Sequence, residues 1–171
     1  MRYLFDSDVL INSARLHYHP NYCQAFWDWV TAGYRAGIFY SIDKVKDELL
    51  DGDEDPLHAW ANAPALTGFF QPSNQALPLW GKLTKFATDP ARAYKESAKS
   101  KFLNADKADA WLIAHAAHQK DFTIITNETS APDSKREIKL PDASAWLSVP
   151  TTRIHPVLHN FAQGNFKFQI K

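Results

Sequence analysis

Carboxylates in apolar or small-residue surroundings are the side chains of this sequence whose types and spacing could do chemistry. Two interrupt the stretch YLFDSDVLI, Glu48 is one of the four acids in SIDKVKDELLDG, two occur in ADKADAWLIAHAA, and one ends FTIITNE. In chain order they are Asp6, Asp8, Glu48, Asp106, Asp109 and Glu128. Carboxylates brought together repel one another, and either protonation or bound cations relieve that repulsion. Mg²⁺ or Mn²⁺ is the natural counter-ion, because both prefer oxygen ligands and two such ions about 4 Å apart can activate water in phosphodiester hydrolysis.

Each acid taken singly also has an ordinary structural explanation. Acids at helix starts complement the helix dipole, and acids after strands form turns. Asp8 fits a turn residue, and Asp106 fits a residue of a first helical turn. Asp6 and Asp109 fit such roles less well, because an unpaired carboxylate in an apolar or small-residue face is costly.

The acids can meet only if the elements that carry them place them at one edge of a sheet. Apolar runs predict strands over residues 3–5, 38–40, 122–126 and 151–154, with the first ending near Asp6 and running into a loop. Strands that alternate with helices favour a parallel sheet of the α/β class. Side chains that follow such strands converge at the carboxyl edge of the sheet.

Helical periodicity fills the segments between these strands. It predicts helices over residues 19–33 closed by Gly33, 42–51 after a Ser41 cap and before Gly52, 104–119 capped by Asn104, and from Pro156 onward. The helix over 104–119 would place Asp106 and Asp109 on one face. The middle, with five prolines between residues 53 and 100, predicts short helices over 77–87 and 91–100.

Length and composition predict one folded domain over residues 1–171, with a helical insertion over 63–103. Lys and Arg balance Asp and Glu at 19 each, so a polyanionic partner would need a local basic patch. The single cysteine, Cys23, excludes an internal disulfide and a Cys-based zinc cluster, and fits a packing role. An acid interrupts the first apolar stretch and no run is long enough for a membrane span, so we expect a soluble, cytoplasmic protein.

Four acidic motifs resemble those of the PIN domain, the magnesium-dependent ribonuclease fold of VapC-type toxins and of many RNA-processing nucleases. YLFDSDVLI is similar to the family's hydrophobic-Asp-Thr-Asn-Val-Leu-Ile start, with Asp6 on the acid, Ser7 on the hydroxyl and Asp8 in place of Asn or Ser. SIDKVKDELLDG resembles the second motif and places Glu48 on its acid. ADKADAWLIAHAA resembles the third and places Asp109 on its acid.

FTIITNE resembles the fourth motif, a strand followed by Thr-x-Asp. Thr126 matches, while Glu128 replaces the aspartate and reaches further, which makes Asn127 an alternative ligand there. The later stretch REIKLPDASAWLSVP looks most like an uncharacterised PIN-like subgroup with a longer fourth acid. The four motifs stand in the family's order.

The resemblance implies a three-layer α/β sandwich with a mostly parallel sheet flanked by helices, and a metal-dependent endoribonuclease. It implies that Asp6 and Asp109 hold a first Mg²⁺ or Mn²⁺ ion, that Glu48 supports it, and that Glu128 with Asp106 completes a weaker second site. Asp6, Glu48, Asp109 and Glu128 would be the catalytic acids, and Asp8, Thr126 and Asn127 further candidates. A toxin of this type would have a helix-turn-helix antitoxin as partner, and a homodimer is a further expectation.

RNA would be bound by basic side chains near the third motif. The candidates are Lys95, Lys99, Lys101 and Lys107, in a run that begins with Arg92. A solvated helix face explains the same run about equally well, since acids are interspersed in it.

Two other functions compete with the nuclease. FDSDVL also resembles the Asp-x-Asp start of haloacid dehalogenase-like phosphatases, in which Asp6 would be the nucleophile. The late Gly-Asp-x-x-x-Asp pair of that family has no match here. The other alternative is a non-catalytic PIN-like binding module, which would have no physical reason to keep mutually repelling acids.

Histidines and aromatic residues are further candidate site residues. His115 with His118, and His155 with His159, have helical spacing without a third ligand, which is typical of ordinary helix residues. The aromatic side chains at positions 26, 27 and 29 could stack on bases, but their periodicity favours a place in the core.

Overall fold

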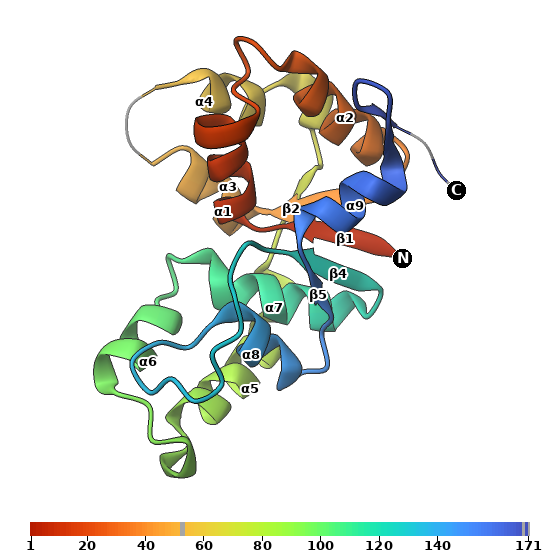
Figure 1. The fold of residues 1–171 in the computed structure, drawn as a ribbon. Coiled ribbons are helices and arrows are strands. Elements are labelled where there is room, and N and C mark those ends of the chain that lie inside the picture. Colours follow the sequence, from red (N-terminus) through yellow and green to blue (C-terminus); the bar gives the residue numbers. More distant parts are fainter. Residues whose placement is uncertain (52–53, 169, 171) are drawn as a thin grey trace.

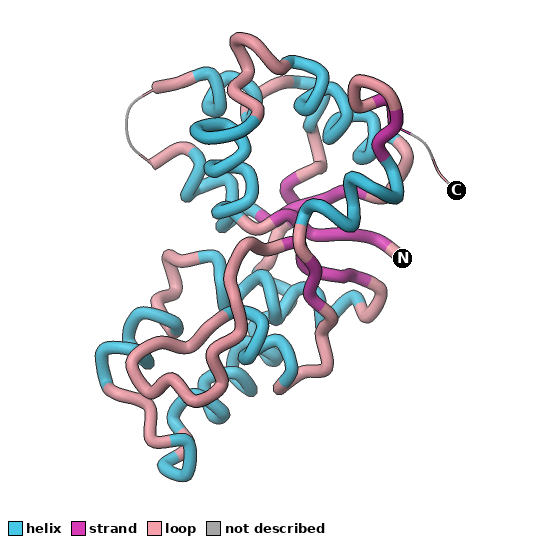
Figure 2. Tube along the Cα trace, in the orientation of Figure 1, coloured by secondary structure: helices cyan, strands magenta, loops and turns pink. Residues whose placement is uncertain are grey.

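The central sheet has five strands, all parallel, among the residues that the computed structural model describes, which are 1–51, 54–168 and 170. The strands are β1 (Arg2–Phe5), β2 (Phe39–Ile42), β3 (Phe70–Gln71), β4 (Phe122–Ile125) and β5 (Thr151–Thr152). Their spatial order is β3-β2-β1-β4-β5. Helices cover both faces (Figures 1 and 2), so the predicted α/β three-layer sandwich is confirmed.

Two helical layers enclose this sheet. One contains α1 (Ser7–Asn12), α2 (Gln24–Arg35), α3 (Asp43–Leu49), α4 (Pro56–Ala61) and α9 (Ile154–Phe161). The other contains α5 (Leu77–Thr88), α6 (Glu96–Phe102), α7 (Ala108–Gln119) and α8 (Leu140–Ala145) (Figure 1). A small antiparallel hairpin, β6 (Ala162–Gln163) and β7 (Lys167–Phe168), follows α9. No helix in the described ranges has the length and apolar character needed to cross a membrane.

Strand β1 lies at the centre, between β2 and β4. Tyr3 aligns with Phe39 of β2 on one side and with Thr123 of β4 on the other. The chain therefore leaves β1 toward β2 and β3, and returns to β1's other side with β4. Ligands of open parallel sheets bind at such a switch point, outside the carboxyl ends of the strands.

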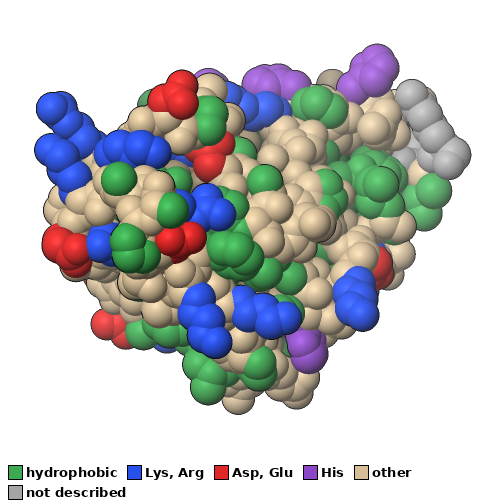
Figure 3. Space-filling model, turned by 90° about the horizontal axis from the view of Figure 1, so that it is seen from below, with side chains coloured by type: hydrophobic (Ala, Val, Ile, Leu, Met, Phe, Trp, Pro, Cys, Tyr) green, Lys and Arg blue, Asp and Glu red, His purple; other side chains and the backbone are tan. Residues whose placement is uncertain are grey.

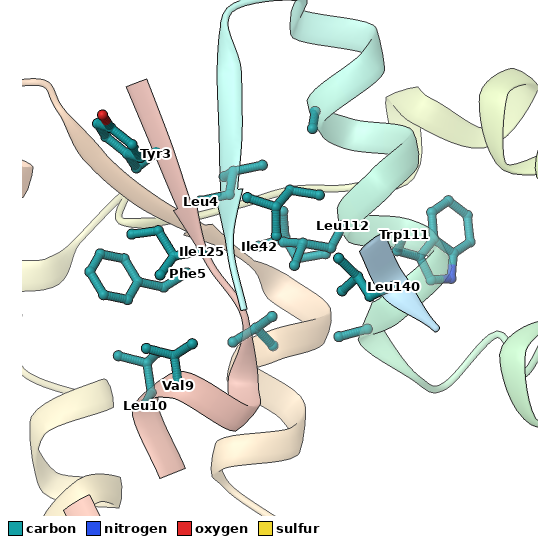
Figure 4. Packing of buried hydrophobic residues seen from close by; sticks show 14 of the residues in the cluster. Tyr3, Leu4, Phe5, Val9, Leu10, Ile42, Trp111, Leu112, Ile125 and Leu140 are labelled. Atoms are coloured by element: carbon teal, nitrogen blue, oxygen red, sulfur yellow. The ribbon is translucent and has the colours of Figure 1, made fainter. Parts of the chain in front are cut away.

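The core lies on both faces of β1. Figure 4 shows Tyr3 and Phe5 on one side of the strand and Leu4 on the other, near Leu112 of α7. Leu4 and Phe5 have no exposed surface. A continuous apolar run such as YLF is the pattern of a strand covered on both faces.

Helix α2 is part of this core, though its predicted bounds were wrong. The three aromatic side chains at positions 26, 27 and 29 are buried, which confirms the core interpretation. The helix begins at Gln24, leaving Tyr22 outside it and 73% exposed, and runs through Gly33 to Arg35. Gly33 does not stop the helix. A Cβ there would lie 2.0 Å from the ring of Phe39, so the glycine permits close packing of α2 on β2.

Other predicted boundaries near the sheet also needed correction. The segment after Asp6 is the helix α1, not a loop. Ser41 belongs to β2, where its buried hydroxyl donates to the Phe5 carbonyl at 2.7 Å, and α3 begins at Asp43 without it. Gly52, predicted to stop this helix, lies outside the described residues.

The middle of the chain is not helical throughout. The prediction for residues 77–87 is confirmed by α5, whereas residues 91–100 divide between a short 3₁₀ turn and α6. The stretch also contains β3, an unpredicted strand that pairs with β2. β3 is two residues long, which is too short to leave a period in the sequence.

The third motif and the last unit follow the predicted order with shifted starts. Helix α7 begins at Ala108, and the Asn104 side chain accepts instead from the Asp106 N–H at 2.9 Å, within the preceding turn. The prediction that Asp106 and Asp109 share a helix face is therefore wrong. Helix α9 begins at Ile154, two residues before Pro156.

Candidate metal centre

Asp6 directly follows β1 and is buried, with 2% of its surface exposed. Its N–H donates to the Ile125 carbonyl at 3.0 Å, so the end of β1 is fixed to the end of β4. The Thr126 hydroxyl donates to Asp6 Oδ2 at 2.8 Å and accepts the Glu128 N–H at 3.1 Å. One buried threonine thus orients an acid of the first motif and the backbone of an acid of the fourth.

Asp8 lies in the first turn of α1, next to the same loop. Its two carboxylate oxygens accept the Asn127 N–H at 3.2 and 3.1 Å. Burial raises the pKa of Asp8, and the negative charge of Glu128 adds to this effect. Asp8 therefore anchors the loop after β4 while standing among other acids, so its role goes beyond that of an isolated turn residue.

Glu48, on the last turns of α3, connects three helices. Its Oε2 accepts the Ser7 hydroxyl of α1 at 2.5 Å, and its Oε1 accepts the Ala108 N–H at the start of α7 at 3.0 Å. A carboxylate at a helix start is favourable, because the first N–H groups of a helix lack partners within it. The sequence motif indicates a hydroxyl at Ser7 but does not predict its contact with Glu48.

Asp109 lies in the first turn of α7 and faces the other acids. Burial raises its pKa to about 6, and the charges of Glu128 and Glu48 contribute. Burial also raises the pKa of Asp6 well above its ordinary value, with the Asp8 and Asp109 charges next in importance. Acids from four separate motifs therefore interact electrostatically at the carboxyl edge of the sheet.

Glu128 is held by the second helical layer. Its Oε2 accepts the Leu140 N–H at the start of α8 at 2.7 Å, and its Oε1 lies 4.0 Å from Lys139 Nζ. Lys139 Nζ also pairs with Glu137 Oε2 at 2.7 Å. A cavity of about 20 Å³, lined by Asp109, Glu128, Lys101 and Lys139 among others, has room for about one water molecule. Lys139 was not predicted, although it stands directly before the LPD helix start.

Some predicted site residues lie apart from this cluster. Asp106 is exposed in the turn before α7. Among the four candidate RNA-binding lysines, Lys101 lines the small cavity, whereas Lys99 pairs with Glu96. Lys95 and Lys107 are exposed. Figure 3, seen from the side of α5, α6 and α8, shows Lys and Arg side chains dispersed among acidic and apolar ones.

The donor chemistry of this cluster fits a hard divalent cation. Its side chains offer carboxylate oxygens, and acids outnumber the two nearby lysines. Within the described ranges, no group of three or more Asp, Glu, His or Cys side chains already has ligating geometry. Both Glu48 oxygens and one Glu128 oxygen accept protein hydrogen bonds instead.

The histidines with helical spacing form no side-chain hydrogen bond with an acid among the described residues. His115 is buried, and its Nε2 is 2.9 Å from Gln71 Oε1. Burial lowers the pKa of His115 to about 4. His155 and His159 are exposed on α9.

The fold and the site together define an α/β protein with a cluster of acids at the switch point of a parallel sheet. The chain belongs to the family described as a domain of unknown function (DUF4411), which matches residues 3–163. The match includes all of the acids discussed above. Neither the comparison with curated proteins nor that with solved structures produced a match.

Proposed function

We propose that this protein is a PIN-like, divalent-metal-dependent endoribonuclease. The observation that carries the proposal is the convergence of acids from separate chain segments at the switch point, where burial and mutual repulsion raise the pKa values of Asp6 and Asp109. Asparagine at either position would fill the same space without repulsion. The repulsion between carboxylates at these positions is unfavourable, and a bound cation would remove it.

Asp6 and Asp109 would hold Mg²⁺ or Mn²⁺, with Glu48 beside them and Glu128 on the side of α8. A cation bound there would lower the pKa of a water molecule and counter the charge of the phosphodiester. The Thr126 hydroxyl keeps the Asp6 carboxyl oriented, and the Ser7 hydroxyl does the same for Glu48.

Two lysines would supply positive charge on the side of α8. Lys101 and Lys139 line the cavity beside Asp109 and Glu128. Their ammonium groups would stabilise negative charge that develops on the phosphate or on the leaving oxygen. This arrangement agrees with a reaction on a polyanionic substrate.

The nuclease agrees with the geometry better than the phosphatase does. A nucleophilic Asp6 would need an accessible oxygen, whereas this side chain is 2% exposed and its Oδ2 accepts from Thr126. A non-catalytic module would leave the clustering of acids without a purpose.

The test is cleavage of a panel of single-stranded and structured RNAs with Mg²⁺, Mn²⁺ or EDTA. We expect cleavage only with metal, and a loss of about two to three orders of magnitude in rate in Asp6→Asn. The matched control is Asp47→Asn, because Asp47 is an exposed acid of α3 next to Glu48. Cleavage by Asp6→Asn at the wild-type rate, or wild-type cleavage in EDTA, would contradict the proposal.

Hydrolysis of a small phosphate monoester instead of RNA would favour the phosphatase.

We propose further that the protein is the toxin of a toxin–antitoxin pair, which rests on its resemblance to VapC-type ribonucleases. Induced expression should then arrest growth, and coexpression of a helix-turn-helix antitoxin should relieve the arrest. Asp109→Asn should abolish toxicity at equal protein level. Unchanged toxicity in that variant would point to a mechanism other than RNA cleavage.

A further inference from the structure

A basic side chain follows the last strand at the edge of the sheet where the acids lie. Arg153 comes directly after β5, and the Thr126 N–H donates to the Thr152 carbonyl at 3.0 Å. Arg153 is exposed, and its Nη2 donates to Thr129 Oγ1 at 2.7 Å. The guanidinium is therefore held along the loop that carries Glu128. Within the described part of the chain it forms no salt bridge, which leaves its charge available to an anion.

Two surface pockets share Arg153 as a wall. One, of about 280 Å³, extends from Arg153 to Thr126 and Glu128. The other, of about 290 Å³, extends from Arg153 to Asn127, whose N–H is bonded to Asp8. Both pockets thus border the acid cluster, and Arg153 stands where they meet.

The second pocket has the chemistry of a site for a flat, polar ring. Its walls include Asn12, His17, Tyr18 and His155, which contribute an amide and three rings, and none of its described lining residues is an acid. One face of the Tyr18 ring is covered by Phe26, on which it stacks with the ring centres 4.5 Å apart. His17 ends a π-helical turn over Ser13–His17, a rare conformation that is frequent at functional sites. Aromatic and imidazole faces stack on bases of any sequence.

We propose that Arg153 binds a phosphate group of single-stranded RNA, and that the pocket of His17, Tyr18 and His155 receives a base of the same strand. This inference rests on the proposed ribonuclease function and names its substrate class. The acid cluster would then act on a bond close to the bound phosphate. A duplex is disfavoured, because its bases are stacked and paired and cannot enter a side pocket.

The experiment measures fluorescence anisotropy of a short labelled single-stranded RNA in EDTA, so that binding is observed without cleavage. We expect Arg153→Gln to weaken binding about tenfold and to lower the slope of log affinity against log salt by about 0.7. The matched control is Arg35→Gln, which removes one exposed arginine at the end of α2, ahead of β2 and so on the opposite edge of the sheet. The control should bind within about twofold of wild type.

A second variant separates the base pocket from the phosphate contact. His155→Ala removes an exposed ring face and should weaken binding about fivefold or more, because stacking on a base is lost. The salt slope should stay as in wild type, because the phosphate contact of Arg153 is kept. Thermal unfolding of each variant should match wild type, since both side chains are exposed.

The inference is overturned if Arg153→Gln binds like Arg35→Gln, or if a duplex of the same sequence binds as tightly as the single strand. RNA cleavage with Mn²⁺ is measured on the same preparations. Wild-type cleavage with no binding defect in Arg153→Gln would refute the subsite and leave the nuclease standing. Binding that depends on Arg153 without any cleavage would refute the nuclease and leave the RNA site standing. Absence of both RNA binding and RNA cleavage in the wild-type protein would contradict both proposals.

Discussion

The two edges of the central sheet differ in how their charged side chains are paired. At the amino edge, Arg2 of β1 pairs with Asp121, with Nε and Nη2 each 2.6 Å from a carboxylate oxygen. The guanidinium also lies 4.2 Å from the ring centre of Phe122. This pairing lowers the pKa of Asp121 and raises that of Arg2. At the carboxyl edge, Asp6 is buried and Asp109 is half-buried beside other acids, and burial raises the pKa values of both.

The charges at the amino edge therefore stabilise the folded state, whereas the ionised acids at the carboxyl edge destabilise it. At the amino edge each ionised group has an opposite partner in water, a contact of small but favourable free energy. At the carboxyl edge the ionised forms are disfavoured by burial and by like charge. The carboxyl edge is thus expected to gain stability when its charge is removed or matched by a cation, and the amino edge to lose stability when its pair is broken.

The largest expected effect is that of Asp109→Asn, which should abolish function and stabilise the protein. RNA cleavage should fall by about two to three orders of magnitude. The free energy of unfolding at pH 7 in EDTA should rise by up to about 3 kcal/mol, the equivalent of restoring a pKa of about 6 to its ordinary value. Urea unfolding measures the stability. A variant that is both inactive and less stable would show that Asp109 is a structural acid.

The same destabilisation by ionised Asp109 should appear in the pH dependence of the wild-type free energy of unfolding. Because the folded pKa of Asp109 is raised to about 6, the folded state holds its proton more tightly than the unfolded state. In EDTA, the contribution of Asp109 to the free energy of unfolding should therefore be greatest at low pH. It should fall by up to about 3 kcal/mol as the pH rises from about 4 to about 6. Mg²⁺ or Mn²⁺ should restore the loss at pH 7, since a ligand of the folded state stabilises it. A pH profile as steep in Asp109→Asn as in wild type would assign the effect to other groups.

The contrast between the edges could be predicted only in part from the sequence. The apolar run before Asp6 and the strand FTIIT indicated where two strands end, and parallel packing then required their following residues to meet. The contacts of Glu48 and Glu128 could not be predicted in the same way. Each binds the first N–H of a helix, and the starts of both helices are set by tertiary packing.

The start of α7 illustrates this limit. Asn104 has the side chain of a helix cap, yet the helix begins four residues later, at Ala108, whose N–H is bound by Glu48 from α3. Local propensity placed the start at the nearest capping residue, whereas a distant carboxylate determines it. A role for Arg153 could not be predicted for a similar reason, because an arginine after a two-residue edge strand has no local sequence pattern.

Glu48 should respond differently to two substitutions, with effects smaller than those at Asp109. Glu48→Gln keeps an oxygen for the Ala108 N–H and removes the charge, so cleavage should fall about 10- to 100-fold with little change in stability. Glu48→Ala leaves the Ser7 hydroxyl and the Ala108 N–H without this acceptor, and should cost about 1–3 kcal/mol in addition. Cleavage assays and urea unfolding on the same preparations separate the two roles. Equal stability of both variants would show that the hydrogen bonds contribute little.

The smallest expected effect lies at the amino edge, and it has the opposite sign to that of Asp109→Asn. Asp121→Asn breaks the pair with Arg2, whose side chains are 29% and 48% exposed for Arg2 and Asp121 respectively. The free energy of unfolding should fall by less than about 1 kcal/mol at low salt, because water already screens this pair, and the loss should shrink further at high salt. RNA cleavage should be unchanged, since the substitution lies at the opposite end of the strands from the acids. A gain in stability from Asp121→Asn would remove the distinction between the edges, because neutralising an acid would then stabilise the fold wherever the acid lies.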